Sequence, residues 1–92
     1  MTDRAYSSVL GHFLDADGRL HTIPSKHSKL LVVLDFLSQA FEPGLRYPES
    51  RVNEILGEFH ADYAALRRYL VENGFLDRAD NHYWRSGGTF DV

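Results

Sequence analysis

The 92-residue sequence predicts a small α+β domain, and two neighbouring features near its C-terminus indicate this class. Helical spacing of apolar residues runs from Asp62 to Asn73 and is followed at once by Gly74, which suits the end of a helix. Two strand-like runs come next, Phe75 to Arg78 and His82 to Arg85, separated by residues that accept a tight turn. A helix that passes directly into a β-hairpin is typical of a winged helix-turn-helix. We therefore expect a three-helix core with a C-terminal hairpin, preceded by an N-terminal helix and hairpin.

The composition is ordinary for a soluble globular protein, and it excludes several classes of site. Apolar residues make up 43% of the chain and charged residues 25%, and no apolar run approaches the ~20 residues that a membrane-spanning helix needs. The absence of cysteine excludes disulfides, thiolate metal sites and cysteine nucleophiles. We expect one cytoplasmic domain over residues 1–92, with a lead-in helix at 1–12, a flexible tail at 86–92 and no membrane association.

The first third of the chain predicts a helix and a hairpin. From Asp3 to Leu14, apolar side chains recur at helical intervals, which indicates a helix with one apolar face. The dipeptide Asp17-Gly18 is typical of a tight hairpin turn, and the segment Leu20 to Ile23 is then the returning strand. This turn also resembles the opening of a calcium loop. Because Arg19 stands where a ligand is required, we favour a turn over a metal site.

The middle of the chain predicts the centre of the core and the next helix. Apolar residues cover most of the helical circumference from Lys26 to Phe41, so this helix must be buried on more than one side. A proline and a glycine at positions 43 and 44 end it. A short extended segment is expected from Leu45 to Tyr47. Pro48 suits the first position of a further helix, whose apolar spacing continues to Phe59.

The helix from Asp62 to Asn73 carries the first candidate contact residues. Its buried side is expected at the apolar positions Tyr63, Leu66 and Leu70. In a DNA complex, small residues on the outer side would permit close approach to the major groove, and an arginine can read guanine with two hydrogen bonds. The residues that this projection turns outward are Ala64, Ala65 and Arg68, with Arg67 on the flank.

Both arginines of this helix have a structural interpretation as well. Arg68 can pair on the surface with Glu72, one turn later, which is worth about 0.2–0.5 kcal/mol. The sequence favours neither this ion pair nor a base contact as the role of Arg68. For Arg67, a stem that lies along the edge of the core is favoured over a DNA contact.

Arg78 and Arg85 flank the expected hairpin, with Tyr83 and Trp84 between them. Basic residues interleaved with aromatics suit a wing that binds phosphate. The alternative is that the aromatics cap the core while the arginines pair with the acidic residues at positions 77 and 80. The core placement is favoured for the aromatics, and both interpretations stay open for the arginines.

Charge and motifs limit the remaining functions. The formal net charge of −3 argues against a strong nonspecific hold on nucleic acid, which needs clustered lysine and arginine. The five histidines lack the spacing of a zinc site, since His60 and Asp62 supply two ligands at most. No phosphate-binding glycine loop or nucleophile motif is present. We therefore expect neither an enzyme nor a bound metal or cofactor.

The sequence also resembles a family of small prokaryotic proteins of unknown function. The resemblance runs from Phe13 to Arg85, and its most specific part is Phe-His-x-Asp at 59–62 followed by Leu-Arg-Arg at 66–68. Members of that family are labelled as transcriptional-regulator-like, and some are attached to a separate winged-helix DNA-binding domain of the ArsR type. The resemblance implies a winged-helix-like fold. It also allows that this domain contacts a partner while another domain binds DNA.

Two functional hypotheses follow. The first is a DNA-binding winged-helix protein that regulates transcription. Its expected contacts with double-stranded DNA are Ala64, Ala65, Arg67, Arg68, Arg78 and Arg85. The second is a protein-interaction module of a regulatory complex that binds no DNA itself, in which Glu54 and Glu58 face a protein partner. The acidic pair favours the second hypothesis, and the arginine pair favours the first.

Overall fold

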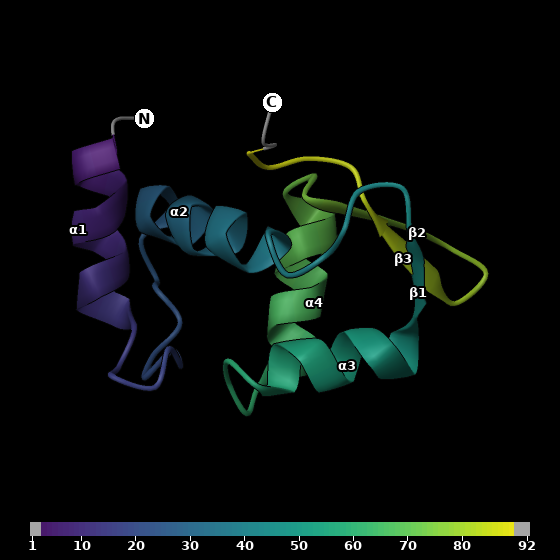
Figure 1. Cartoon of the computed structure of the whole chain (residues 1–92), viewed down its shortest axis with the longest axis horizontal. Helices are drawn as coiled ribbons and strands as arrows, with labels where there is room; N and C mark the ends of the chain where they lie inside the picture. The colour runs from purple at the N-terminus through teal and green to yellow at the C-terminus, as the bar shows by residue number, and fades with distance from the viewer. Residues whose placement is uncertain (1–2, 90–92) are drawn as a thin grey trace.

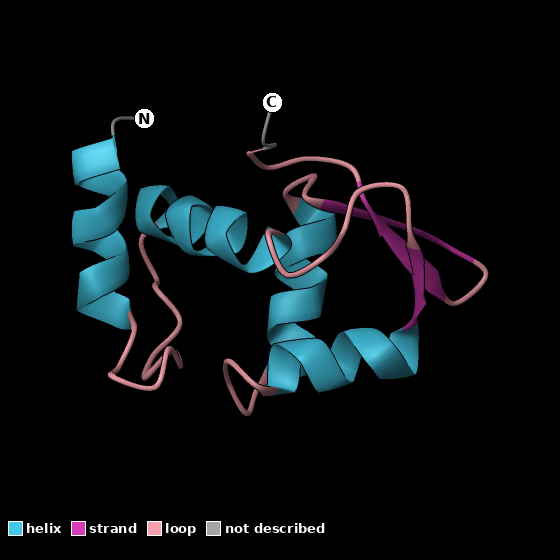
Figure 2. Cartoon of the chain, viewed as in Figure 1, coloured by secondary structure: helices cyan, strands magenta, loops and turns pink. Residues whose placement is uncertain are grey.

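The computed structural model describes residues 3–89, which form four helices and one three-stranded antiparallel sheet. The predicted α+β class is therefore confirmed. The sheet lies at one end of the molecule and α1 at the other, with the remaining helices between them (Figure 1, Figure 2). Within residues 3–89, no helix is long and apolar enough to cross a membrane. In chain order the elements are α1 (Asp3–Phe13), α2 (His27–Ser38), β1 (Arg46–Pro48), α3 (Glu49–Gly57), α4 (Tyr63–Glu72), β2 (Leu76–Ala79) and β3 (His82–Arg85).

The C-terminal hairpin forms as predicted, with one shift at its start. β2 and β3 pair antiparallel with Leu76 opposite Arg85, so β2 begins one residue later than expected. The turn residues Asp80 and Asn81 both have positive φ, at 52° and 65°. Two left-handed residues give a turn whose twist matches that of the paired strands. β3 is the central strand of the sheet, because β1 pairs with its other edge.

α2 is the centre of the hydrophobic core, as its composition predicts. Leu34 and Leu37 have no exposed surface, because α1 packs against one side of the helix and α4 against the other. The helix ends at Ser38, before the predicted end at Phe41. The amides of residues 39–41 continue in tight turns, each donating to the carbonyl three residues earlier. Phe41 still reaches the core and is fully buried.

The segment between α1 and α2 contradicts the predicted N-terminal hairpin. Gly18 makes the expected turn with φ of 78°, but a single bridge between Leu14 and Leu20 joins the two sides, and residues 20–23 form no strand. The Leu20 amide faces away from Leu14 and donates to the carbonyl of Phe59, two residues after the end of α3, at 2.8 Å. The bridge keeps its own two bonds, from the Asp15 amide to the Arg19 carbonyl and from the His21 amide to the Phe13 carbonyl. The ladder goes no further because α1 continues to Phe13, and a helical segment has no free edge for a strand.

Arg19 fixes the same segment against α3. Its guanidinium donates to the carbonyl of Gly57 at 3.2 Å and to that of Glu58 at 2.6 Å. The last carbonyls of a helix have no partner in its own ladder, and a cation at this end also favours the helix dipole. Arg19 therefore caps the C-terminal end of α3.

α3 begins one position after the predicted start. Pro48 is the last residue of β1, where it has φ of −65° and ψ of 153°, and it precedes the helix as its cap residue. The Glu49 amide donates to the Asn81 carbonyl in the hairpin turn at 3.1 Å. Pro48 stays extended because the chain completes its pairing with β3 before it becomes helical.

A buried carboxylate on α2 joins α1 to the end of the described chain. Asp35 is 9% exposed and accepts from the Tyr6 hydroxyl of α1 at 2.8 Å. It also accepts from the Thr89 amide at 2.7 Å. A buried carboxylate needs such donors, so this group organises the polar contacts of α1 and the C-terminal segment.

The described part of the expected tail, residues 86–89, packs against the rest of the fold. Residues 86–89 are held by hydrogen bonds, including that of the Gly87 amide to the Phe75 carbonyl at 3.2 Å. Gly88 has φ of 87° and passes so close to α2 that any side chain there would collide with the Ser38 hydroxyl. The paired glycines therefore permit close packing. The rest of the expected tail, residues 90–92, and the first two residues of the lead-in helix lie outside the described residues.

Leu34→Ala should destabilise the fold far more than Leu45→Ala. Leu34 is fully buried, so its truncation leaves a cavity and should cost about 2–5 kcal/mol. Leu45 is 48% exposed, and the same change there should alter the free energy of unfolding by about 0.5 kcal/mol or less. Urea unfolding followed by circular dichroism measures both. Equal losses would contradict the position of α2 at the centre of the core.

Candidate nucleic-acid interface

α4 is bounded by the residues that the sequence predicts. The Asp62 carboxylate accepts from the Ala65 amide at 3.3 Å and thereby caps the first turn. Asn73 closes the other end, and Gly74 follows it with φ of 79°. The predicted helical span is therefore confirmed, with Asp62 and Asn73 as its two caps.

The face that α4 buries differs from the prediction at two positions. Ala65 is buried together with Leu66 and Leu70, whereas Tyr63 is 40% exposed. Tyr63 is the first residue of α4 and lies beside Gly57, the last residue of α3, so no further turn of α3 covers it. The outward placement expected for Ala65 is therefore wrong, because the buried face is not centred on Tyr63.

Arg68 and Ala64 lie on the exposed side of α4, as predicted. The Arg68 side chain is 60% exposed and pairs with the Glu72 carboxylate at 3.8 Å, so the surface pair expected as one alternative is present. The guanidinium also lies over the Tyr69 ring, 5.3 Å from its centroid. An ion pair this exposed contributes little stability, and a stronger anion can displace Glu72 at small cost.

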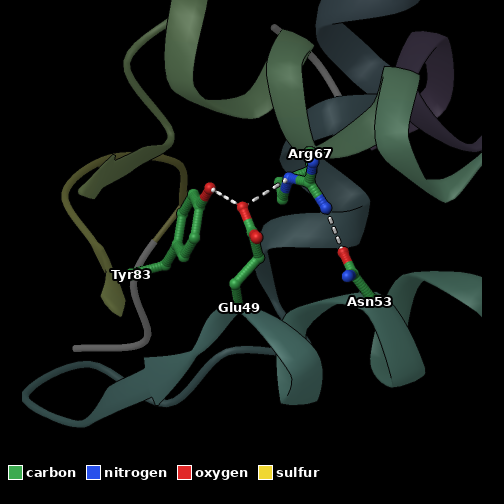
Figure 3. A network of polar contacts seen from close by, with 4 residues as sticks. All are labelled: Glu49, Asn53, Arg67 and Tyr83. Carbon is green, nitrogen blue, oxygen red and sulfur yellow. Dashed lines mark hydrogen bonds and ion pairs between the residues drawn. The ribbon is translucent and has the colours of Figure 1, made fainter. Parts of the chain in front are cut away.

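Arg67 is held in a polar network that joins three elements (Figure 3). Its Nε lies 3.4 Å from Oε1 of Glu49, at the start of α3, and its guanidinium also donates to the Asn53 side chain. The same Glu49 oxygen accepts from the Tyr83 hydroxyl of β3 at 2.7 Å. Figure 3 shows these four side chains converging between α3, α4 and the sheet. Arg67 is thus fixed in position, which agrees with the structural role favoured for it.

Tyr83 forms the buried end of this network. Tyr83 is only 1% exposed. Burial is the larger cause, and the hydrogen bond to Glu49 the next, of a phenol pKa that lies above the ordinary value of 10.0. The placement of this aromatic in the core is confirmed. At neutral pH, Tyr83 therefore remains a donor to Glu49.

Arginines from α4 and from the hairpin meet at one hollow between these elements. The hollow has a volume of about 380 Å³. The Arg78 guanidinium extends from β2 over the Tyr83 ring, 5.8 Å from its centroid. The Asp77 carboxylate, expected as a partner for an arginine side chain, instead accepts from the Arg78 amide at 2.8 Å. The lining residues are Ala64, Arg67, Arg68, Val71, Glu72, Arg78 and Tyr83.

Arg85 does not belong to this surface, which corrects its expected place beside Arg78. It is 9% exposed and donates to the carbonyls of Gly87, at 3.1 Å, and Thr89. Strand alternation explains the result: Arg85 shares the inner face of β3 with Tyr83, while Trp84 lies on the outer face. Its guanidinium is therefore occupied by the C-terminal segment.

Three residues near this region were not expected from the sequence. Glu49 and Asn53, one helical turn apart on α3, hold Arg67, and Arg46 lies 4.4 Å over the Trp84 ring on the outer face of the sheet. The four-residue spacing of Glu49 and Asn53 is a recognisable pattern, but their partner is distant in the chain. Within residues 3–89, no group of three histidine or acidic side chains converges as a metal site.

The fold should lose stability as the pH rises above about 10. Burial and hydrogen bonding to a carboxylate raise the pKa of both Tyr6 and Tyr83 above the ordinary value of 10.0. Between the unfolded and folded pKa values, the folded state binds more protons than the unfolded chain. The stabilisation is therefore complete below pH 10 and is lost as the pH rises through the folded values.

Thermal unfolding across this alkaline range measures the effect. Tyr83→Phe should show a smaller decline with pH than the parent protein, because its share of the linkage is removed. Tyr63→Phe, at an exposed position, should keep the full decline. Identical pH profiles for the parent and Tyr83→Phe would contradict the raised pKa.

Comparison with known proteins identifies the family. The sequence model of a family described as "Uncharacterized protein conserved in bacteria (DUF2087)" matches residues 19–85. No curated protein and no solved structure matches the chain. The matched span runs from the arginine that caps α3 to the last residue of β3, and the description gives no fold or activity. The predicted membership of a prokaryotic family of unknown function is confirmed, and the chain belongs to the DUF2087 family of proteins conserved in bacteria.

Proposed function

We propose that this chain is a winged-helix protein that binds double-stranded DNA in transcriptional regulation. The element order from α2 to β3 and the strand order β1-β3-β2 support this proposal. A winged helix combines three helices with a small antiparallel sheet whose last two strands form the wing. In this assignment α3 and α4 are the helix-turn-helix, α4 is the recognition helix, and β2 with β3 is the wing.

The observation that carries the proposal is the hollow between α4 and the wing. Arg67, Arg68 and Arg78 line it together, although the third comes from a different element. Contacts from both a recognition helix and a wing orient a protein on the duplex, because phosphate contacts set its register. The exposed Ala64 leaves room beside Arg68 for the edge of a base. The contact set of this proposal is therefore Ala64, Arg67, Arg68 and Arg78, without the buried Ala65 and Arg85.

The charge balance makes binding dependent on these few arginines. The net charge of −3 supplies no general attraction to phosphate. Arg68 must leave Glu72 to reach a base, and this exposed pair is weak enough to exchange for a charged hydrogen bond to guanine. We therefore expect low affinity for random sequence and a marked preference for sites that offer guanine to Arg68.

The second candidate function is a protein-interaction module without DNA binding. It is favoured by the exposed side chains of Glu54 and Glu58 on the outer face of α3. Glu54 pairs with Arg51 at 3.3 Å, so the negative charge of this face comes mainly from Glu58. Such a face repels phosphate and attracts a basic protein surface. The DNA experiment below distinguishes the two functions.

Gel mobility and fluorescence titration with mixed duplexes at low salt test DNA binding. Arg68→Ala should remove sequence preference at about 1–3 kcal/mol, because it removes a base contact. Arg78→Ala should weaken all sequences alike and lower the slope of log affinity against log salt by about 1, because it removes a phosphate contact. Arg4→Ala is the matched control, since it removes the same charge from the exposed surface of α1, at the opposite end of the molecule from the wing.

Two outcomes would contradict the proposal. One is unchanged mobility with micromolar protein at low salt, which favours the protein-interaction module. The other is an equal loss of affinity in Arg4→Ala and Arg78→Ala, which indicates a general charge effect. Emission from Trp84 is a supporting measurement only, because this half-buried ring lies under Arg46 on the outer face of the sheet.

A further inference from the structure

The hollow between α4 and the wing has the electrostatic character of an anion site. Three arginines line it, and Glu72 is the acidic residue among its lining residues. Glu49 of α3 offsets the charge of Arg67, since its Oε1 lies 3.4 Å from the Arg67 Nε. Three positive charges therefore face two negative ones, and the hollow keeps a local excess of positive charge within a protein whose net charge is −3.

The three arginines differ in how firmly they are held. Arg67 is the rigid member, because Glu49 and Asn53 fix its guanidinium and its side chain is 23% exposed. Arg68 is exchangeable, since its partner is the exposed Glu72. Within residues 3–89, Arg78 forms no ion pair, and its guanidinium lies over the Tyr83 ring. A site with one fixed guanidinium and two that can move suits an oxyanion, because each guanidinium can donate two parallel hydrogen bonds to it.

The size and walls of the hollow suit a phosphate that carries an organic group. Its volume of about 380 Å³ exceeds what a bare oxyanion fills, and it falls within the range of small-molecule sites, about 300–1,000 Å³. Ala64, Val71 and the Tyr83 ring supply apolar wall beside the cations. A sugar carbon can rest on such a wall while the phosphate contacts the arginines.

We propose that this hollow binds one phosphate ester group, with Arg68 and Arg78 as its direct ligands and Arg67 as a fixed positive wall. The ester comes either from the backbone of bound DNA or from a free nucleotide-like phosphate monoester. The first source rests on the proposed DNA-binding function, and the second does not. Glu72 competes with the phosphate for Arg68 and therefore lowers the affinity of the hollow for the phosphate.

Nuclear magnetic resonance titration of the full chain tests this assignment. The probes are inorganic phosphate, thymidine 5′-monophosphate, thymidine without phosphate, and a short mixed duplex. Both phosphate compounds should shift the side-chain Nε–H resonances of Arg68 and Arg78 and the backbone amides of Ala64 and Val71. The nucleotide should bind more tightly than inorganic phosphate because of the apolar wall. Thymidine should shift none of these resonances.

Four variants make the test specific. Arg78→Ala should weaken nucleotide binding about tenfold, the effect of removing one charged hydrogen-bond donor pair. Glu72→Gln should tighten it about twofold, because the competing carboxylate is gone. Arg78→Lys should restore part of the affinity, and Arg4→Ala should leave it unchanged. Circular dichroism melting checks that each variant folds. Of the three positions changed, Arg4 and Glu72 lie on exposed helix surfaces, and Arg78 is exposed on the edge strand β2.

The outcomes separate this inference from the DNA proposal. Nucleotide binding at the hollow without duplex binding supports a phosphate monoester site and refutes the DNA function. Duplex binding that Arg78→Ala leaves unchanged, together with no nucleotide binding at the hollow, refutes the phosphate site. It also removes Arg78 from the proposed DNA contacts, and leaves duplex binding through another surface standing. No shift with millimolar nucleotide or with the duplex, or equal shifts with thymidine, overturns the assignment of the hollow.

Discussion

The two-residue turn at Asp80 and Asn81 is the constraint on which the candidate site depends. Its positive φ values fix the register of β2 against β3, and this register turns Tyr83 inward and Trp84 outward. A slip of one residue would reverse every side chain of β3. The Tyr83 hydroxyl would then leave Glu49, and Arg67 would lose part of the network that holds it. A local turn thus determines the position of a cation on another element.

The site combines a rigid part with an adjustable part. The rigid part is the network of Glu49, Asn53, Arg67 and Tyr83, which is tied to three elements and is half-buried or buried (Figure 3). The adjustable part is Arg68 and Arg78, whose side chains lie at the surface. Preorganised charge lowers the cost of binding, while mobile charge permits one surface to fit different anions. The hollow therefore suits a ligand that is recognised mainly by its charge and less by its shape.

Local patterns predicted most of the fold, and long-range contacts account for the errors. The Asp62 cap and the Gly74 stop defined α4, and the hairpin followed from its turn residues, because these features act within a few residues. The strand expected at Leu20 to Ile23 is reduced to one bridge, because α1 continues to Phe13 and leaves only Leu14 to pair with it. Among the site residues, Arg67, Arg68 and Arg78 meet at the hollow, but Ala65 and Arg85 are buried. Their burial depends on tertiary packing of α4 and on the C-terminal segment, which periodicity does not contain.

Asp35 anchors the two segments that lie on either side of the span matched by the family model. The family match covers residues 19–85, so α1 and residues 86–89 both lie outside it, on opposite sides in sequence. Both are anchored by the same carboxylate of α2, through Tyr6 and Thr89. Each donor offsets part of the cost of burying this carboxylate, so loss of either anchor leaves that cost less well compensated. The two flanks therefore share one polar anchor on α2, and a change of Asp35 acts on both of them at once.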